Sequence, residues 1–142
     1  MEKQSFINHV RVHPVYHYFA VPLSLALIPV AIVNIFFRLD LTSILLAIAA
    51  VLLHLSIFLS REYAKKNQDR IIRSELRLSY YLLTNKRLDQ MEENFSNAQL
   101  LALRFCSDEE LVEMLSDPAT KSKTPVQIKQ SIIQWRADWM RV

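Results

Sequence analysis

The chain has 142 residues, of which 51% are hydrophobic and 22% are charged, and its formal net charge is +3. This length corresponds to one domain, or to one domain with an appendage. The chain contains no glycine, which excludes the P-loop and the dinucleotide-binding loop, because both need glycine for positive φ and close backbone approach. A single cysteine excludes a disulfide framework and a cysteine-based zinc site within one chain.

The charged residues are distributed unevenly. Residues 18–60 contain only Arg38 and Asp40, and all other Lys, Arg, Asp and Glu residues lie outside this stretch. Such a division is typical of a membrane segment joined to a soluble segment.

Residues 1–17 are predicted to be an N-terminal segment at the level of the lipid headgroups. Three histidines recur in it at intervals of four: His9, His13 and His17. On a continuous helix they would share one face and could bind a metal ion. Pro14 disfavours helix at the residue before it. We therefore expect anchoring at the interface, with Tyr16 in an aromatic belt, and no metal or other cofactor.

Two uncharged stretches of twenty residues, 18–37 and 41–60, are predicted to be transmembrane helices. At a rise of 1.5 Å per residue, each covers about 30 Å, the thickness of the hydrocarbon core. Only three residues connect them, so 18–60 should form an antiparallel hairpin with both ends on one side. Two buried helices of a soluble protein are the alternative, but the remaining chain is too short to cover them.

Basic residues predict that this side is the cytoplasm. Lys3 and Arg11 precede the first span, Arg38 alone lies in the connector, and six basic residues follow the second span: Arg61, Lys65, Lys66, Arg70, Arg73 and Arg77. By the positive-inside rule both termini are cytoplasmic. We expect Arg61, Lys65 and Lys66 to contact lipid headgroups.

The hairpin's contact face follows from its register. With the turn at Leu39, facing residues have numbers that sum to about 78, which pairs Ser24 with His54, Ala31 with Ala47, and Ile35 with Ser43. Small residues at such a face let two helices approach closely.

His54 and Asn34 are the polar groups of most interest in the spans. Ionisable residues inside a membrane are functional candidates by default. The alternative for His54 is a neutral imidazole, hydrogen-bonded to Ser24, that joins the two helices. We favour this structural interpretation for His54 and a similar one for Asn34.

Residues 61–142 are predicted to form a helical cytoplasmic domain. The second span should continue without a break to about Leu83, because neither proline nor glycine interrupts it, and Thr84-Asn85 should end it. Residues 85–95 are expected to be a loop.

Three short helices should follow, each opened by a capping-box pattern. The patterns begin at Ser96, Ser107 and Thr124. Asp117-Pro118 should end the middle helix, which leaves residues 119–123 as a linker.

The two parts of this domain carry opposite charge. Residues 61–87 contain eight Lys or Arg against three Asp or Glu, whereas residues 89–117 contain eight acidic residues and one basic residue. We expect the acidic part to fold back on the basic helix. Surface ion pairs are individually weak, so the packing should come from apolar side chains: Leu100, Leu103, Phe105, Leu111, Met114 and Leu115.

The last predicted helix carries an apolar stripe at spacings of four, three and four: Ile128, Ile132, Trp135 and Trp139. Such a stripe is most often core, and contact with another subunit or with the membrane surface are the alternatives.

The sequence shows no recognisable pairing of a nucleophile with a general base, and we expect no enzymatic activity. Cys106 is followed by acidic residues, which should raise the pKa of its thiol and make it less reactive. Nucleic-acid binding is not expected, because contact with anionic lipid explains the basic stretch better.

Four sequence motifs resemble a family of short bacterial two-span membrane proteins that is catalogued as a domain of unknown function. These motifs are NHVRVHP, QDRIIR, LRFCSDEEL and the closing IKQSIIQWRADWMRV. The resemblance covers nearly the whole chain and implies a bacterial inner-membrane location, but it supplies no activity or catalytic residues.

The sequence therefore predicts an all-α integral membrane protein that acts as an interaction or scaffolding module. Its expected partners are the lipid bilayer and either further copies of itself or another membrane protein. The alternative is a subunit of a small oligomeric pore or transporter, with Asn34 and His54 on the polar path.

Overall fold

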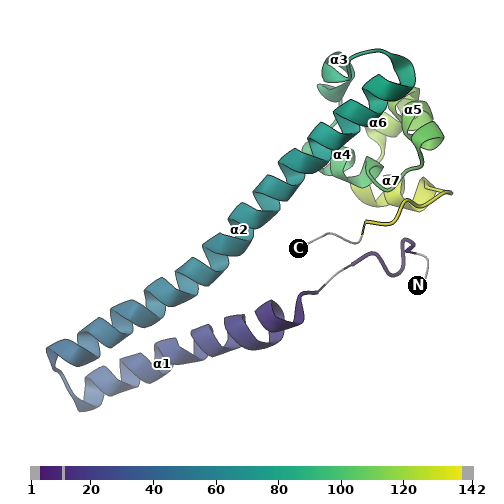
Figure 1. Cartoon of the computed structure of the whole chain (residues 1–142). Coiled ribbons are helices and arrows are strands. Elements are labelled where there is room, and N and C mark those ends of the chain that lie inside the picture. Colours follow the sequence, from purple (N-terminus) through teal and green to yellow (C-terminus); the bar gives the residue numbers. More distant parts are fainter. Residues whose placement is uncertain (1–3, 11, 139–142) are drawn as a thin grey trace. The chain divides into compact units, whose positions relative to one another are not determined.

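The computed structural model describes residues 4–10 and 12–138, apart from the side chain of Gln90 (Figure 1). This part of the chain contains helices and no strands, as predicted for an all-α protein. It divides into two compact units. We call residues 12–66 the helix pair, and residues 4–10 with 67–138 the helical unit. Predictions on Lys3, Arg11 and Trp139 fall outside the described residues.

The first apolar stretch is helical from Val15. It begins as a π-helical segment, η1 (Val15–Ala20), and continues as α1 (Val21–Phe37). The amide of Val21 donates to the carbonyl of Tyr16, five residues back. Pro22, the next residue, has no N–H to donate and its ring would crowd the carbonyl of Tyr18 in a regular α-helix, so a wider turn fits this position.

The second apolar stretch is the first half of α2 (Leu41–Thr84), a continuous helix of 44 residues. Asp40 caps its start, because its carboxylate accepts from the amide of Ser43 at 2.7 Å. Asn85 has a φ of 54° and ends the helix, as predicted from Thr84-Asn85. Asparagine tolerates this left-handed conformation better than most residues, and the chain has no glycine for the position.

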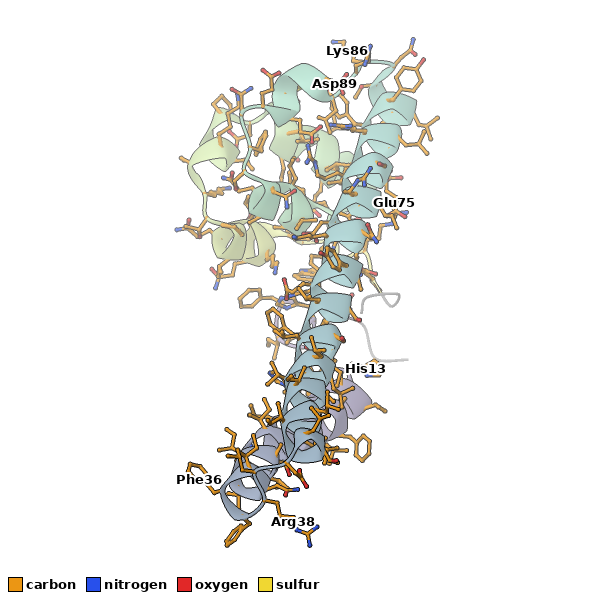
Figure 2. The ribbon with its side chains drawn as sticks, turned by 90° about the vertical axis from the view of Figure 1, so that its left-hand side faces the viewer. His13, Phe36, Arg38, Glu75, Lys86 and Asp89 are labelled. Carbon is orange, nitrogen blue, oxygen red and sulfur yellow. The ribbon has the colours of Figure 1, made fainter. Side chains whose placement is uncertain are left out.

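Both apolar helices, Val15–Phe37 and Leu41–Thr84, are long and apolar enough to cross a membrane by length and composition. In the helix pair, small side chains are buried where α1 and α2 meet: Ser24, Ala31, Ser43 and Ala50. At the connector end, Phe36 and Arg38 project outward (Figure 2).

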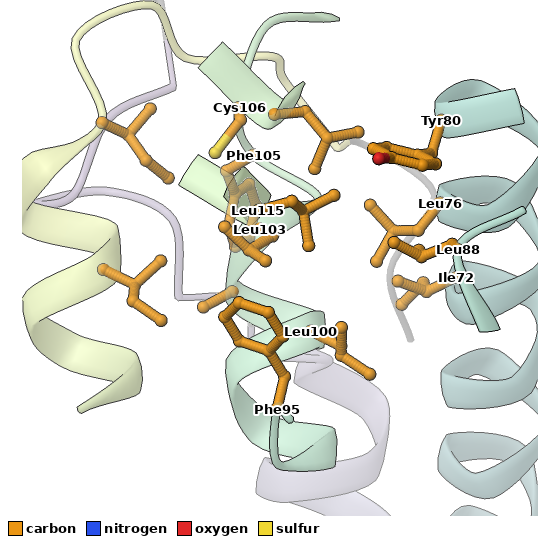
Figure 3. Packing of buried hydrophobic residues seen from close by; sticks show 14 residues of the cluster. Ile72, Leu76, Tyr80, Leu88, Phe95, Leu100, Leu103, Phe105, Cys106 and Leu115 are labelled. Atoms are coloured by element: carbon orange, nitrogen blue, oxygen red, sulfur yellow. The ribbon is translucent and has the colours of Figure 1, made fainter. Parts of the chain in front are cut away.

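The helical unit packs short helices against the second half of α2. These are α3 (Asp89–Glu92), α4 (Asn97–Leu103), α5 (Asp108–Ser116), α6 (Pro118–Ser122) and α7 (Pro125–Ser131). Ile72, Leu76 and Tyr80 of α2 face the core (Figure 3). The other side of the core contains fully buried side chains, among them Leu103, Phe105 and Leu115. The predicted packing of the acidic part on the basic helix is confirmed.

The predicted helix starts are confirmed, with one difference. Ser96 with Gln99, and Thr124 with Gln127, form reciprocal capping boxes. Ser107 accepts from the amide of Glu110, but the Glu110 side chain does not return to the cap. Its carboxylate instead accepts from the backbone amides of residues 133 and 134, at 2.7 and 3.2 Å.

This use of Glu110 accompanies a correction at the C-terminus. The sequence predicts one helix through the Ile128–Trp135 stripe, whereas α7 ends at Ser131 and residues 132–138 have no helical structure. An extended segment needs partners for its amides, and Glu110 supplies two of them. Ile128 and Ile132 are buried and Trp135 packs against the core, so the predicted core role of these three holds without the helix.

Two predicted loops contain short helices. The sequence predicts a linker at residues 119–123, but α6 begins at Pro118 because Asp117 accepts from the amide of Ala119 at 2.9 Å. Asp-Pro thus ends one helix and caps the next, as Thr-Pro does at α7. Within the predicted loop 85–95, α3 forms a single turn.

The N-terminal segment is divided between the two units. The sequence grouped residues 1–17 together, but residues 4–10 belong to the helical unit, where the side chains of Gln4 and His9 are buried. The Gln4 side chain accepts from the backbone amide of Asp138 at 2.7 Å. Sequence periodicity gave no sign of this contact, because it joins two irregular segments.

Candidate functional site

Four polar side chains of the two apolar helices form two pairs between α1 and α2. Ser24 Oγ lies 3.0 Å from His54 Nδ1 and also donates to the carbonyl of Val21. Because the single hydroxyl proton of Ser24 goes to that carbonyl, the His54 ring donates from Nδ1 to the serine oxygen. The predicted contact between Ser24 and His54 is confirmed.

Asn34 makes the second polar contact in the helix pair. Ser43 Oγ donates to Asn34 Oδ1 at 3.3 Å. Ser43 therefore contacts the residue that precedes its predicted partner, Ile35. Both contacts join α1 to α2 in the region of the buried small residues. This arrangement can hold two helices in register in an apolar solvent, where hydrogen bonds between helices contribute roughly 1 kcal/mol each.

The basic residues expected to contact headgroups follow the apolar part of α2. The Arg61 guanidinium lies 4.5 Å from the centre of the Tyr16 ring, and Lys66 Nζ lies 5.6 Å from the centre of the Tyr63 ring. Lys65 forms an ion pair with Glu62. Arg61 and Tyr16 also line a surface hollow with His13. A cation over an aromatic ring is well suited to a membrane interface.

Further along α2, two arginines hold one buried carboxylate. The Glu92 side chain is only 7% exposed, and it accepts from Arg73 Nε at 2.7 Å and from Arg77 Nε at 2.6 Å. Burial by itself raises the pKa of Glu92, but the hydrogen bonds and charges of Arg77 and Arg73 outweigh it and lower the pKa. Opposite net charge indicated that the two segments meet; only the structure identifies these partners.

The three histidines considered as metal ligands have other contacts. His9 Nδ1 lies 2.6 Å from the carbonyl of Phe6 and its Nε2 lies 3.3 Å from Lys129 Nζ, so both ring nitrogens are engaged. His13 Nδ1 accepts from the amide of Tyr16, and the His17 ring meets the Tyr16 ring edge-on. The described residues contain no group of three or more His, Cys, Asp or Glu side chains placed to hold a metal ion.

Cys106 is buried in the core of the helical unit, with its Sγ 3.5 Å from Met114 Sδ. Burial, with a smaller contribution from the charge of Glu110, raises the pKa of the Cys106 thiol to about 12. The predicted increase in the pKa of Cys106 is therefore confirmed. Its larger cause is burial, which could not be predicted from the neighbouring acidic residues.

We expect Cys106 to resist alkylation while the helical unit is folded. At pH 8 a thiol with a pKa of about 12 is almost entirely protonated, and the thiolate is the reactive form. Maleimide labelling followed by mass spectrometry should give no adduct in native protein and one adduct in urea. Rapid labelling of the native protein would contradict this assignment.

The chain belongs to the family of unknown function DUF6526, which it matches over residues 1–142. No curated protein and no solved structure matches it.

Proposed function

We propose that this chain is a membrane-anchored, self-associating interaction module of the bacterial inner membrane. In this proposal the helix pair is the anchor and the helical unit lies in the cytoplasm. The observation that carries the proposal is the contrast between the inside and the outside of the helix pair.

Inside the helix pair, Ser24 contacts His54 and Ser43 donates a hydrogen bond to Asn34. Outside, both helices expose large apolar side chains: Leu23, Leu25, Leu27, Val30, Ile32 and Val33 on α1, and Leu45, Leu46, Ile48, Leu52, Leu53 and Leu55 on α2. Soluble monomers rarely expose apolar patches of this extent. A bilayer removes the free-energy cost of exposing these side chains to water, because its hydrocarbon core is as apolar as they are.

The role as an interaction module is supported by the helical unit. One face of α2 is used for the core, while its outer face leaves Ile71, Leu78 and Leu82 exposed. Exposed apolar side chains in a row at helical spacing are typical of a surface that binds another helix.

A pore lined by Asn34 and His54 has less support. A polar path requires these side chains to face a common water-filled space, yet both are turned toward the partner helix of the same chain.

The membrane topology is tested by cysteine accessibility. We expect a cysteine at Leu39, whose side chain is 82% exposed in the connector, to react with an impermeant maleimide added to intact cells. A cysteine at exposed Lys86 should react only after the membrane is permeabilised. Buried Cys106 provides a silent background.

The opposite labelling pattern would reverse the orientation. Equal labelling of both positions in intact cells would rule out an anchor that crosses the membrane.

A further inference from the structure

The face of α2 opposite the core carries exposed residues at the spacing of a coiled coil. Ile71 and Leu78 are 58% and 59% exposed, and they lie seven residues apart. Between and beside them on the same face are Asn67, Ser74 and Tyr81, all exposed. The five positions follow spacings of four, three, four and three, which is the a/d repeat of a coiled coil. Glu75 on this face points away from helices α3 to α7 (Figure 2).

The charges beside this seam are complementary in one orientation only. With Ile71 and Leu78 at a, Arg70 occupies a g position and Glu75 the e position five residues later. In a parallel two-stranded coiled coil, a g residue of one helix faces the e residue five positions on in the other. Arg70 would therefore meet Glu75 of a second copy, twice by symmetry. Within the described residues neither side chain forms an ion pair in its own chain.

We propose that residues 67–81 of α2 form a parallel, two-fold symmetric coiled-coil contact with α2 of a second copy of this chain. The inference rests on the proposed function, because two copies anchored in one membrane with the same orientation present these helices in parallel. Confinement to a bilayer raises their effective concentration, which allows a seam of only two heptads to associate. The polar seam residues Asn67 and Ser74 weaken the contact but favour one register.

Charge reversal tests the contact directly. In mild detergent, sedimentation of the full-length protein should show a dimer. Arg70→Glu or Glu75→Arg alone should weaken dimerisation about tenfold, because each places two like-charged pairs across the seam. The double variant Arg70→Glu/Glu75→Arg should restore it, since the pairs reform with exchanged partners.

An apolar variant and a matched control complete the set. Leu78→Asp should give a monomer. Ile133→Lys also introduces a charge, at a more exposed apolar side chain, 87% exposed, in the same unit but outside α2, and should remain dimeric. All of these side chains lie on the surface, so the variants should keep the circular dichroism of the wild type.

Cross-linking fixes the orientation in native membranes. Residues at d meet their own counterparts in a parallel pair, so Ser74→Cys should form a disulfide-linked dimer on mild oxidation. Ser122→Cys, an exposed serine on α6, should not. A dimer that tolerates Leu78→Asp and fails to cross-link at Ser74 would overturn the α2 contact and leave self-association through another surface. A wild-type monomer under both conditions would overturn the α2 contact and self-association together.

Discussion

Phe105→Ala is expected to destabilise the helical unit strongly while the helix pair stays intact. The Phe105 side chain is 1% exposed. The centre of its ring lies 4.8 Å from the centre of the Trp135 ring and 5.7 Å from that of the His9 ring. Phe105 therefore joins the core to both irregular terminal segments. Truncating a buried phenylalanine to alanine costs about 3–5 kcal/mol, because transfer free energy is lost and a cavity remains.

That cost is large compared with the stability available. A unit of this size has a free energy of unfolding of roughly 4–12 kcal/mol at the usual value per residue. Urea unfolding of the detergent-solubilised protein, followed by tryptophan fluorescence, should show a midpoint shifted far toward low denaturant. Ile133→Ala, at an exposed position of the same unit, is the control and should change stability little. A loss below about 1 kcal/mol for Phe105→Ala would show that this ring is not a core residue.

Removing both arginines from Glu92 should cost more than removing Glu92 itself. The double variant Arg73→Met/Arg77→Met leaves a buried carboxylate without a cation, which costs about 3–5 kcal/mol for a buried pair. Glu92→Met leaves two arginines whose side chains are 39% and 47% exposed and therefore stay in contact with water, so we expect a loss of about 1 kcal/mol. Equal losses from the two variants would contradict the assignment of Glu92 as the buried member.

The pH dependence of stability should have opposite signs in the wild type and in the double variant. In the wild type the pKa of Glu92 is lowered on folding, so its contribution to stability is present above its ordinary pKa of 4.5 and is lost as the pH falls through the lowered value. Without the arginines, burial acts alone and raises the pKa. Protonation then favours the folded state, so the double variant should gain stability as the pH falls from 7 to 5. Denaturation at several pH values measures both.

The helices that depend on local chemistry could be predicted from the sequence. Ser96 and Thr124 begin helices because their hydroxyls accept from amides three residues on, and Asn85 ends α2 because it adopts positive φ. The contact between Ser24 and His54 also followed from local information, because a three-residue connector leaves one register for two antiparallel helices. All these features depend on residues close in sequence or on simple helix geometry.

Other features depended on partners distant in the chain. The pattern around Ile132 and Trp135 predicts continued helix, but Glu110 binds the amides of residues 133 and 134, and Phe105 accepts from the amide of Arg136 at 2.8 Å. Likewise, the histidine spacing does not indicate that His9 is buried and packs against the Phe105 and Trp135 rings. Sequence periodicity reports which face of a segment is apolar. It does not report which backbone amides will find an acceptor in a distant part of the chain, and those long-range hydrogen bonds decide where the last helix stops and how residues 132–138 join the core.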